Sequence, residues 1–306
     1  MSGALRMSVV IASWNAADVL DRCLESLRSQ EVTGGFETIV VDNASTDGTQ
    51  EVLGRHADHV RALVNARNEG FALANNRGAG EARGAALFFL NNDTELLSPD
   101  VLERLAQVVE QPGVAIAGPM LVNPDGTLQP SCAQHPSVTQ AVLIATGLHR
   151  LLPDRLRARV APTRWSHSWA TDTGWVKGAA LAVRADVFRD LGGFWPTLFG
   201  EEQDLAFRAQ RRGLRVRFEP SVRVMHIGNQ TVGKRHSRVA RGERIAHAEL
   251  LILRTHYPRL RALAIRAVVA AGFAARAAGY AALGRRDRAA LFAAMTRVYR
   301  AGSAPG

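Results

Sequence analysis

The chain has 306 residues, which is enough for one large α/β domain with an appendage. Its two cysteines, Cys23 and Cys132, form no CxxC pair, so we expect neither a disulfide framework nor a structural zinc site, and a reducing cytoplasm fits. The formal net charge of +10 lies in the segment from Arg238 onward, where 13 Arg face three acidic residues. The first 237 residues are therefore near neutral. This distribution argues against a nucleic-acid binder and for a basic C-terminal appendage.

Targeting signals are not evident in the sequence. The chain begins Met-Ser-Gly without the charged and apolar regions of a signal peptide. It also has no run of 18 uncharged apolar residues, so we expect no helix that spans a membrane.

The first 90 residues alternate strands with helices. The predicted strands cover residues 7–12, 38–41, 60–64 and 86–90, and helical spacing of apolar residues predicts helices near 19–27, 50–56 and 72–83. This alternation favours a parallel sheet with right-handed crossovers, whose ligands lie at the carboxyl ends of the strands. Asp42 and Asp93 follow two of these strands, so both are expected to face one crevice.

Asp93 is the first candidate for chemistry. A carboxylate beyond a strand end can hold a divalent cation, and that cation can neutralise a diphosphate. The alternative is that Asp93 only caps the next turn. Residues 88–97 alone leave both readings open.

Seven motifs occur in a fixed order along the chain. They are SVVIASWN (8–15), VDNASTDGT (41–49), NEGFALANNRG (68–78), FFLNNDTEL (88–96), VKGAALAVRADVFRDLGGF (176–194), FGEEQDLAFRAQRRG (199–213) and VRVMHIG (222–228). With these motifs, residues 7–227 resemble the inverting family 2 glycosyltransferases. Each motif alone is weak, but their ordered series is specific.

The resemblance implies a fold and a domain division. The fold is the GT-A nucleotide-diphospho-sugar transferase fold, an α/β architecture with a mostly parallel central sheet flanked by helices, here followed by a C-terminal helical appendage. Residues 1–237 would form the glycosyltransferase domain, with a nucleotide-sugar-binding half at 1–120 and an acceptor-binding, catalytic half at 121–237. Residues 238–306 would form an Arg- and Ala-rich helical tail.

The resemblance also implies roles for individual residues. Asp42 would accept a hydrogen bond from the imide of a uracil or thymine base, and Trp14 would lie against that base. Glu202 would be the catalytic base. Mg²⁺ or Mn²⁺ would be bound by Asp93 and His226. The donor-binding set is Ala12, Trp14, Asn15, Asp42, Asn43, Asn75, Asn92 and Asp93, and the acceptor-binding set is Asp204, Trp175 and Trp195.

The chemistry of sugar transfer agrees with these roles. A divalent cation stabilises the leaving diphosphate, and a carboxylate takes the proton of the attacking hydroxyl. For Glu201, Glu202 and Asp204 the alternative is that three acids simply suit a helix N-terminus. For His226, which follows an alternating strand, the alternative is a purely structural histidine.

Some positions depart from the family pattern. The chain has Glu201-Glu202 where many relatives have Glu-Asp. It has Trp195 where many relatives have Asp, and this Trp ring would offer a stacking platform for a sugar ring. The pair Asn75-Asn76 and the NNDT and EExDL sequences resemble a rhamnosyltransferase-like branch. The suggestion of a rhamnose donor rests on that analogy alone.

Two segments outside the motifs raise separate questions. Residues 128–172, rich in Pro and Trp, are interpreted as a partly helical insertion over the active site, and a lid is one option. In the tail, Pro258 divides helical segments, and residues 285–300 place Leu291, Phe292, Met295, Val298 and Tyr299 on one stripe. Such a basic amphipathic helix either lies on an anionic membrane or docks on its own chain or a second subunit.

The sequence therefore predicts a cytoplasmic, metal-dependent, inverting glycosyltransferase. Its donor would be a dTDP- or UDP-sugar, with rhamnose as the analogy suggests, and its acceptor a glycan, with a polyprenyl-linked glycan as one option. Peripheral contact with the inner face of the plasma membrane through residues 259–300 and homo-oligomerisation are further options. Two alternatives stay open: a nucleotidyltransferase of similar fold, and a catalytically inactive glycan- or membrane-binding scaffold.

Overall fold

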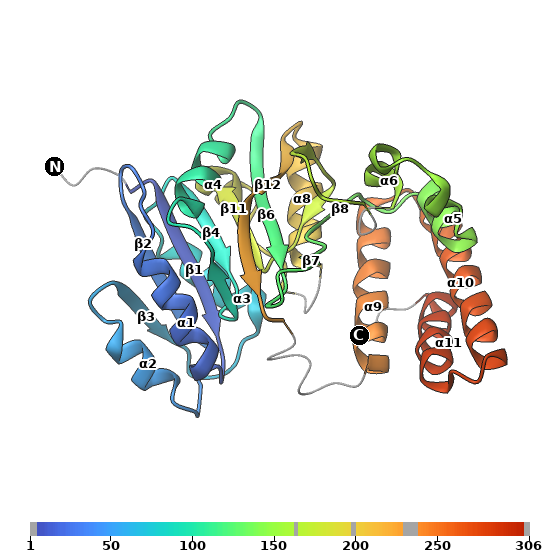
Figure 1. Cartoon of the computed structure of the whole chain (residues 1–306), viewed down its shortest axis with the longest axis horizontal. Helices are drawn as coiled ribbons and strands as arrows, with labels where there is room; N and C mark the ends of the chain where they lie inside the picture. Colours follow the sequence, from blue (N-terminus) through green and yellow to red (C-terminus); the bar gives the residue numbers. More distant parts are fainter. Residues whose placement is uncertain (1–4, 162–164, 197–199, 229–237, 303–306) are drawn as a thin grey trace. The chain divides into compact units, whose positions relative to one another are not determined.

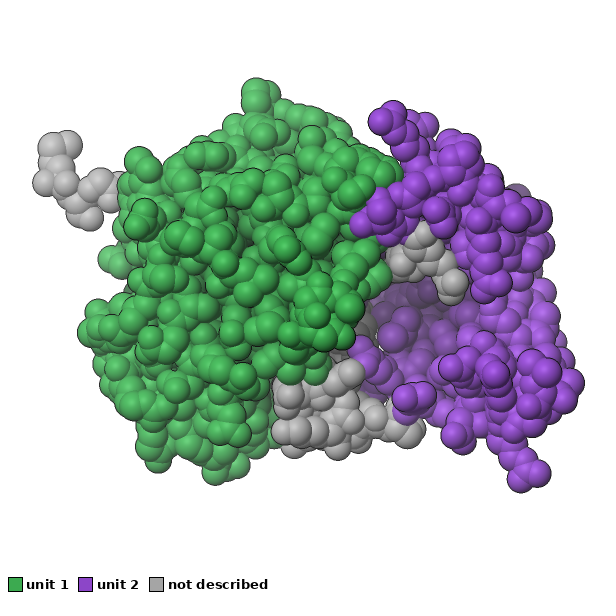
Figure 2. Space-filling view, viewed as in Figure 1, with its two compact units in different colours: residues 1–132, 167–196, 201–234 green, residues 133–166, 197–200, 235–306 purple. Residues whose placement is uncertain are grey.

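The protein divides into two compact units in the computed structural model, which describes residues 5–161, 165–196, 200–228 and 238–302. The first unit comprises residues 1–132, 167–196 and 201–234, and the second comprises 133–166, 197–200 and 235–306 (Figure 2). The predicted division after residue 237 falls among residues outside the described ranges and stays a prediction. Residues 133–166 group with the C-terminal helices rather than with the acceptor-binding half in which the sequence analysis put them.

A mixed sheet forms the centre of the first unit (Figure 1). Its strands, in spatial order, are β3 (Val60–Val64), β2 (Phe36–Asp42), β1 (Met7–Ser13), β4 (Ala86–Leu90), β11 (Ala180–Arg184), β6 (Val114–Val122), β12 (Arg215–His226) and β5 (Thr94–Leu96). Strands β7 (Leu128–Gln129) and β9 (Thr171–Asp172) pair with β6 and β12, while β8 is Cys132–Ala133 and β10 is Trp175–Val176. The four neighbouring strands from β3 to β4 pair in parallel, as predicted. Strand β11 runs antiparallel to both β4 and β6.

Helices of the first unit follow the strands in the expected alternation. They are α1 (Ala17–Arg28), α2 (Thr49–Arg55), α3 (Phe71–Gly80), α4 (Val101–Val109), α7 (Ala185–Asp190) and α8 (Glu201–Arg211). The apolar residues of α1 recur every three or four positions, and all five that the spacing selects are buried. Every residue of β4 is buried, which explains its uninterrupted apolar sequence.

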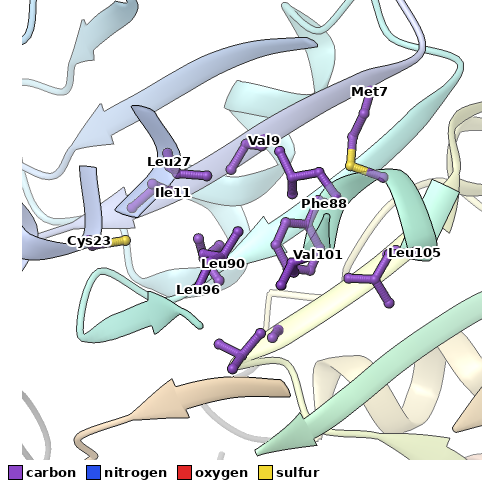
Figure 3. Packing of buried hydrophobic residues seen from close by; sticks show 14 of the residues in the cluster. Met7, Val9, Ile11, Cys23, Leu27, Phe88, Leu90, Leu96, Val101 and Leu105 are labelled. Atoms are coloured by element: carbon purple, nitrogen blue, oxygen red, sulfur yellow. The ribbon is translucent and has the colours of Figure 1, made fainter. Parts of the chain in front are cut away.

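The core of the first unit is assembled from alternate residues of the central strands and from buried residues of α1, α2 and α4. In Figure 3, Val9 and Ile11 of β1 and Phe88 and Leu90 of β4 are among its labelled members. Cys23 of α1 belongs to the same cluster, and burial raises the pKa of its thiol to about 12. Cys23 is therefore a core residue.

The second unit is helical among its described residues. It contains α5 (Val138–Thr146), a short 3₁₀ helix η1 (Leu148–Leu151), α6 (Asp154–Val160), α9 (Arg238–His256), α10 (Arg259–Ala282) and α11 (Arg286–Ala301). Pro258 precedes α10, as expected for a residue that ends one helix and starts the next. Gly272 lets α10 approach α5, because a Cβ there would lie 2.8 Å from the Cβ of Ala145.

The apolar stripe of α11 packs inside this unit. Tyr299 is fully buried, its ring lies 5.6 Å from that of Phe273 on α10, and its hydroxyl donates a 2.6 Å hydrogen bond to Glu249 on α9. Phe292 stacks on Tyr280 of α10. The docked helix is therefore the reading that the structure supports. Contact of this segment with a membrane is not tested by the structure and stays a prediction.

Helix α10 is the one described helix that is long and apolar enough to cross a membrane, with a mean hydropathy of 1.4 over its 18-residue window. Only 17% of that window is buried in the structure. The sequence analysis expected no helix able to span a membrane, and α10 departs from that expectation by length and composition alone. The same test is also passed by some helices of soluble proteins.

Candidate functional site

Polar side chains gather at the carboxyl edge of β1, β2 and β4. Because these strands are parallel neighbours, their ends meet at one edge, with Ser13 in register with Asp42. Asn92, just beyond β4, donates a 3.1 Å hydrogen bond to the Ser13 hydroxyl. Asp42, Asn92 and Asp93 are all buried. The structure thus brings the two predicted carboxylates to one edge of the sheet.

Asp42 is the last residue of β2 and is held by the turn that follows it. Its Oδ1 accepts a 2.5 Å hydrogen bond from the Ser45 hydroxyl, and the Gln50 amide donates to its Oδ2. Ala44, between them, adopts a left-handed φ of 60°, which is uncommon for a residue with a Cβ. A base imide would therefore meet a carboxylate whose orientation is already fixed, with Gln50 as its neighbour.

The other predicted donor residues surround this edge in different ways. Ala12 and Trp14 are half-buried at the end of β1. Asn15 has a left-handed φ of 48°, and its Oδ1 accepts a 2.7 Å hydrogen bond from the Thr46 amide, so the first loop is tied to the second.

Asn43 and Asn75 lie deeper. Asn43 is engaged within the protein, because its Oδ1 accepts from Asn65 at 2.6 Å and its amide donates to the Gly70 carbonyl. Asn75 on α3 is 1% exposed, and its amide donates to the Phe71 carbonyl. Its Oδ1 has no hydrogen-bond partner among the described residues. A buried acceptor of this kind is where a ligand donor gains most.

Asp93 and His226 form the candidate metal centre. Strand β12 pairs antiparallel with β5, and this pairing sets His226 opposite Thr94. The result is a distance of 3.2 Å between His226 Nε2 and Asp93 Oδ1, across 133 positions of sequence. No group of three or more His, Cys, Asp or Glu suited to a metal occurs in the described part of the chain. Diphosphate and water oxygens could supply further ligands.

Gln129 of β7 decides which nitrogen of His226 faces Asp93. Its Nε2 donates to the His226 carbonyl at 3.1 Å and to Asn123 Oδ1 at 2.9 Å, which fixes the orientation of its amide. Gln129 Oε1 is then the acceptor 2.6 Å from His226 Nδ1, so Nδ1 carries the proton. In the neutral imidazole, Nε2 presents a lone pair toward the Asp93 carboxylate. Two acceptors that face each other suit a divalent cation between them.

Helix α8 begins with the candidate catalytic acids. Glu201 is buried, and burial together with the neighbouring Glu202 charge raises the pKa of Glu201 well above its usual value. Burial also raises the pKa of Glu202, while the Gly178 backbone and the Lys177 charge oppose that rise. The Lys177 charge thus favours the ionised form of Glu202. A carboxylate whose pKa is moved toward neutrality suits a general base.

Asp204, predicted to shape the acceptor site, makes a buried ion pair with Arg208. The Nη2–Oδ2 distance is 2.6 Å, and the side chain of Asp204 is 2% exposed. Arg208 also donates to the carbonyls of Leu191 at 2.5 Å and Gly193 at 2.8 Å. Through Arg208, Asp204 therefore holds the loop that leads to Trp195.

The two predicted acceptor tryptophans are both half-buried. The Arg208 guanidinium lies 5.8 Å from the centre of the Trp195 ring, so this ring is held by a cation–π contact. Trp175 lies on β10, two residues before Lys177.

Asn76 is a residue whose contribution sequence reasoning missed. Its Oδ1 accepts from the Phe194 amide and its Nδ2 donates to the Phe194 carbonyl, both at 2.8 Å. Asn76 thus joins α3, on the nucleotide side, to the Gly193-Phe194 turn on the acceptor side. Gln129, Gln50 and Arg208 were missed as well. None of them stands out in sequence, and only the glycines at 192–193 signalled a special backbone there.

Comparisons with known proteins agree with this geometry. The family model described as "Glycosyl transferase family 2" matches residues 8–176, more than half of the chain. The O-antigen biosynthesis protein RfbC of Myxococcus xanthus is 29% identical over 230 residues, which are 73% of this chain and 17% of that protein. The N-acetylglucosaminyl-diphospho-decaprenol L-rhamnosyltransferase of Mycobacterium tuberculosis is 28% identical over 254 residues, 74% of this chain and 78% of that enzyme.

A solved structure matches the fold over most of the chain. The mannosyltransferase PcManGT from Pyrobaculum calidifontis, in complex with GDP-Man and Mn²⁺, superposes with a TM-score of 0.62 at 19% identity, covering 97% of this chain and 86% of that one. This confirms the predicted GT-A fold. Together with the family match, it shows that the chain belongs to glycosyl transferase family 2, with a rhamnosyltransferase among its relatives.

Proposed function

We propose that the protein transfers a sugar, with inversion, from a dTDP- or UDP-sugar to a hydroxyl of a glycan acceptor, in a metal-dependent reaction. One observation carries this proposal above the others. His226 Nε2 and Asp93 Oδ1 face each other at 3.2 Å with Gln129 holding the proton on the far side of the ring, an arrangement that favours a divalent cation. Bound there, Mg²⁺ or Mn²⁺ would neutralise the charge of the leaving diphosphate.

The residues of the chain would divide the remaining work. Asp42 would accept the imide hydrogen bond of the base, with Trp14 against the ring. Asn75 Oδ1, buried and without a hydrogen-bond partner among the described residues, would accept a hydrogen bond from the donor. The Glu202 carboxylate would take the proton of the acceptor hydroxyl as the new glycosidic bond forms. Burial and the neighbouring Glu202 charge raise the pKa of Glu201, which disfavours a second negative charge beside the base.

The finer assignments rest on analogy. A rhamnose donor and a polyprenyl-linked acceptor are supported by the name of the rhamnosyltransferase relative and by the resemblance of the motifs. A cytoplasmic location at the inner face of the plasma membrane, where such an acceptor would be met, is part of the same proposal. The acceptor sugars would lie against Trp175 and Trp195.

The decisive experiment replaces Glu202 by Gln, which keeps the shape and removes the proton acceptor. A base acts in the transition state, so we expect kcat to fall about 10²–10⁴-fold while donor affinity changes little. Initial transfer rates from a panel of nucleotide-sugars, with donor affinity from calorimetry, measure both quantities.

Two neighbouring variants serve as controls. Glu201→Gln should be mild, because the role of the base is assigned to Glu202. Asp204→Asn should lower thermal stability, because it leaves Arg208 without its buried ionic partner. Near-parental turnover in Glu202→Gln would place the base elsewhere. Pyrophosphate release from a nucleoside triphosphate would identify a nucleotidyltransferase, and binding without turnover of any nucleotide-sugar would identify a scaffold.

A further inference from the structure

The second unit contains a pocket of about 450 Å³ between α9 and α10. Its walls come from one face of each helix, because the lining positions on both helices recur every three or four residues. The lining used below consists of Arg254, Arg259, Arg266, Leu250, Leu253 and Leu263. The volume lies within the range of small-molecule sites. None of the lining residues belongs to the candidate active site.

Three arginines line this pocket and have no carboxylate partner among the described residues. No hydrogen bond or ion pair from Arg254, Arg259 or Arg266 to a carboxylate occurs among the described residues, and no acidic residue is part of the lining. Other arginines of the same unit are engaged. Arg276, for example, donates to the Ile144 carbonyl at 2.5 Å. The pocket therefore presents three guanidinium groups whose donors suit a phosphate.

The rest of the wall is apolar. Leu250 and Leu253 are 2% and 1% exposed, and Leu263 is 42% exposed. The Tyr257 hydroxyl, which also borders the pocket, already donates to the Pro136 carbonyl at 2.7 Å. Leu260, on the outer side of the same turn of α10, is 82% exposed and extends the apolar surface beyond the pocket. A free phosphate would satisfy the arginines but leave Leu263 and Leu260 exposed.

We propose that this pocket binds an amphiphile with a phosphate head and an alkyl chain. The head pairs with Arg254, Arg259 and Arg266, and the chain lies along the exposed side chains of Leu263 and Leu260. The ligand is either a phospholipid within a bilayer or a monomeric alkyl phosphate, because both present the same chemistry. This site is independent of the proposed sugar transfer, since it uses no residue of the first unit.

The test uses dodecyl phosphate below its micellar concentration as the probe and the full chain as the protein. Calorimetry compares dodecyl phosphate, inorganic phosphate and dodecyl maltoside, which vary the head and the chain separately. The site variant is Arg254→Gln/Arg259→Gln/Arg266→Gln. The charge-matched control is Arg238→Gln/Arg285→Gln/Arg286→Gln, three exposed arginines of the same unit outside the pocket.

Dodecyl phosphate is expected to bind more tightly than either other ligand, and the site variant to weaken that binding at least ~10-fold. The control should leave it within about 2-fold, because arginines outside the pocket act on the probe only through screened attraction. Leu263→Ser should weaken dodecyl phosphate while leaving inorganic phosphate unchanged. Equal loss in the site variant and the control, or equal binding of dodecyl maltoside, would overturn the proposal. If inorganic phosphate bound as tightly as dodecyl phosphate, the proposal that the ligand carries an alkyl chain would be refuted.

Vesicles distinguish the two sources of the ligand. If phosphatidylglycerol vesicles displace dodecyl phosphate from the full chain and phosphatidylcholine vesicles do not, the occupant is an anionic lipid of a bilayer. If neither displaces it, the occupant is a monomeric amphiphile. In both cases the site variant must lose the interaction that the control retains.

Discussion

Replacing Gln129 by Leu is expected to weaken Mn²⁺ binding although Gln129 would not touch the ion. In the protein, Gln129 Oε1 accepts the Nδ1 proton of His226 at 2.6 Å and so keeps the lone pair on Nε2. Without that acceptor, the imidazole can adopt the other tautomer. Its Nε2–H would then donate to Asp93 Oδ1, which lies 3.2 Å away, and both candidate ligands would be consumed by one hydrogen bond.

The size of the effect follows from that hydrogen bond. A hydrogen bond to a charged group contributes about 1.5–3 kcal/mol, and the bond from Nε2–H to Asp93 would have to break before the ion could bind. At 1.4 kcal/mol per decade, this corresponds to a loss of about 10–150-fold in affinity. The range agrees with the ~10–100-fold typical of residues that orient a metal ligand.

The assay is Mn²⁺ binding followed by electron paramagnetic resonance in the presence of nucleoside diphosphate, which needs no turnover. The control is Gln107→Leu, the same substitution at an exposed position of α4. A double-mutant cycle isolates the coupling: in a His226→Ala background, Gln129→Leu should cause no further loss. An unchanged affinity in Gln129→Leu, or a second full loss in the His226→Ala background, would refute the tautomer argument.

Two other expectations concern contacts between distant segments. Asn76→Asp should raise the acceptor KM more than the donor KM, because a carboxylate still accepts from the Phe194 amide but repels the Phe194 carbonyl. Steady-state kinetics of Asn76→Asp and Asn76→Ala measure both KM values, and parental values in both variants would contradict this expectation. Tyr299→Phe should destabilise the protein by about 1–3 kcal/mol, and by more at pH values where Glu249 is ionised than in acid, as measured by thermal unfolding across a pH series. Burial raises the pKa of Glu249, so the stability that this group contributes is present in full below its ordinary pKa and is lost as pH rises through its raised pKa. The hydrogen bond from Tyr299 limits that loss, because it stabilises the Glu249 carboxylate. An effect of Tyr299→Phe that does not depend on pH would refute the pairing.

The sequence alone determined the parts of this protein that obey local rules. The alternation of strands and helices over residues 7–90 and the burial of Cys23 follow from periodicity, which each short segment carries by itself. Because parallel strands end at one edge of a sheet, the sequence also predicted that Asp42 and Asp93 lie near the same edge. The ordered motifs were enough to predict the family.

Only the tertiary structure decided which polar side chains meet. The pairing of β5 with β12 brings His226 to Asp93, and β7 brings Gln129 to His226, although neither contact has a periodic signature. Likewise, the apolar stripe of α11 fits both a helix on a membrane surface and a helix packed against protein. Which of the two applies depends on whether α9 and α10 offer a complementary apolar face. An amphipathic sequence fixes which face of a helix is apolar but not what covers it, because burial against protein and burial against lipid remove the same surface from water.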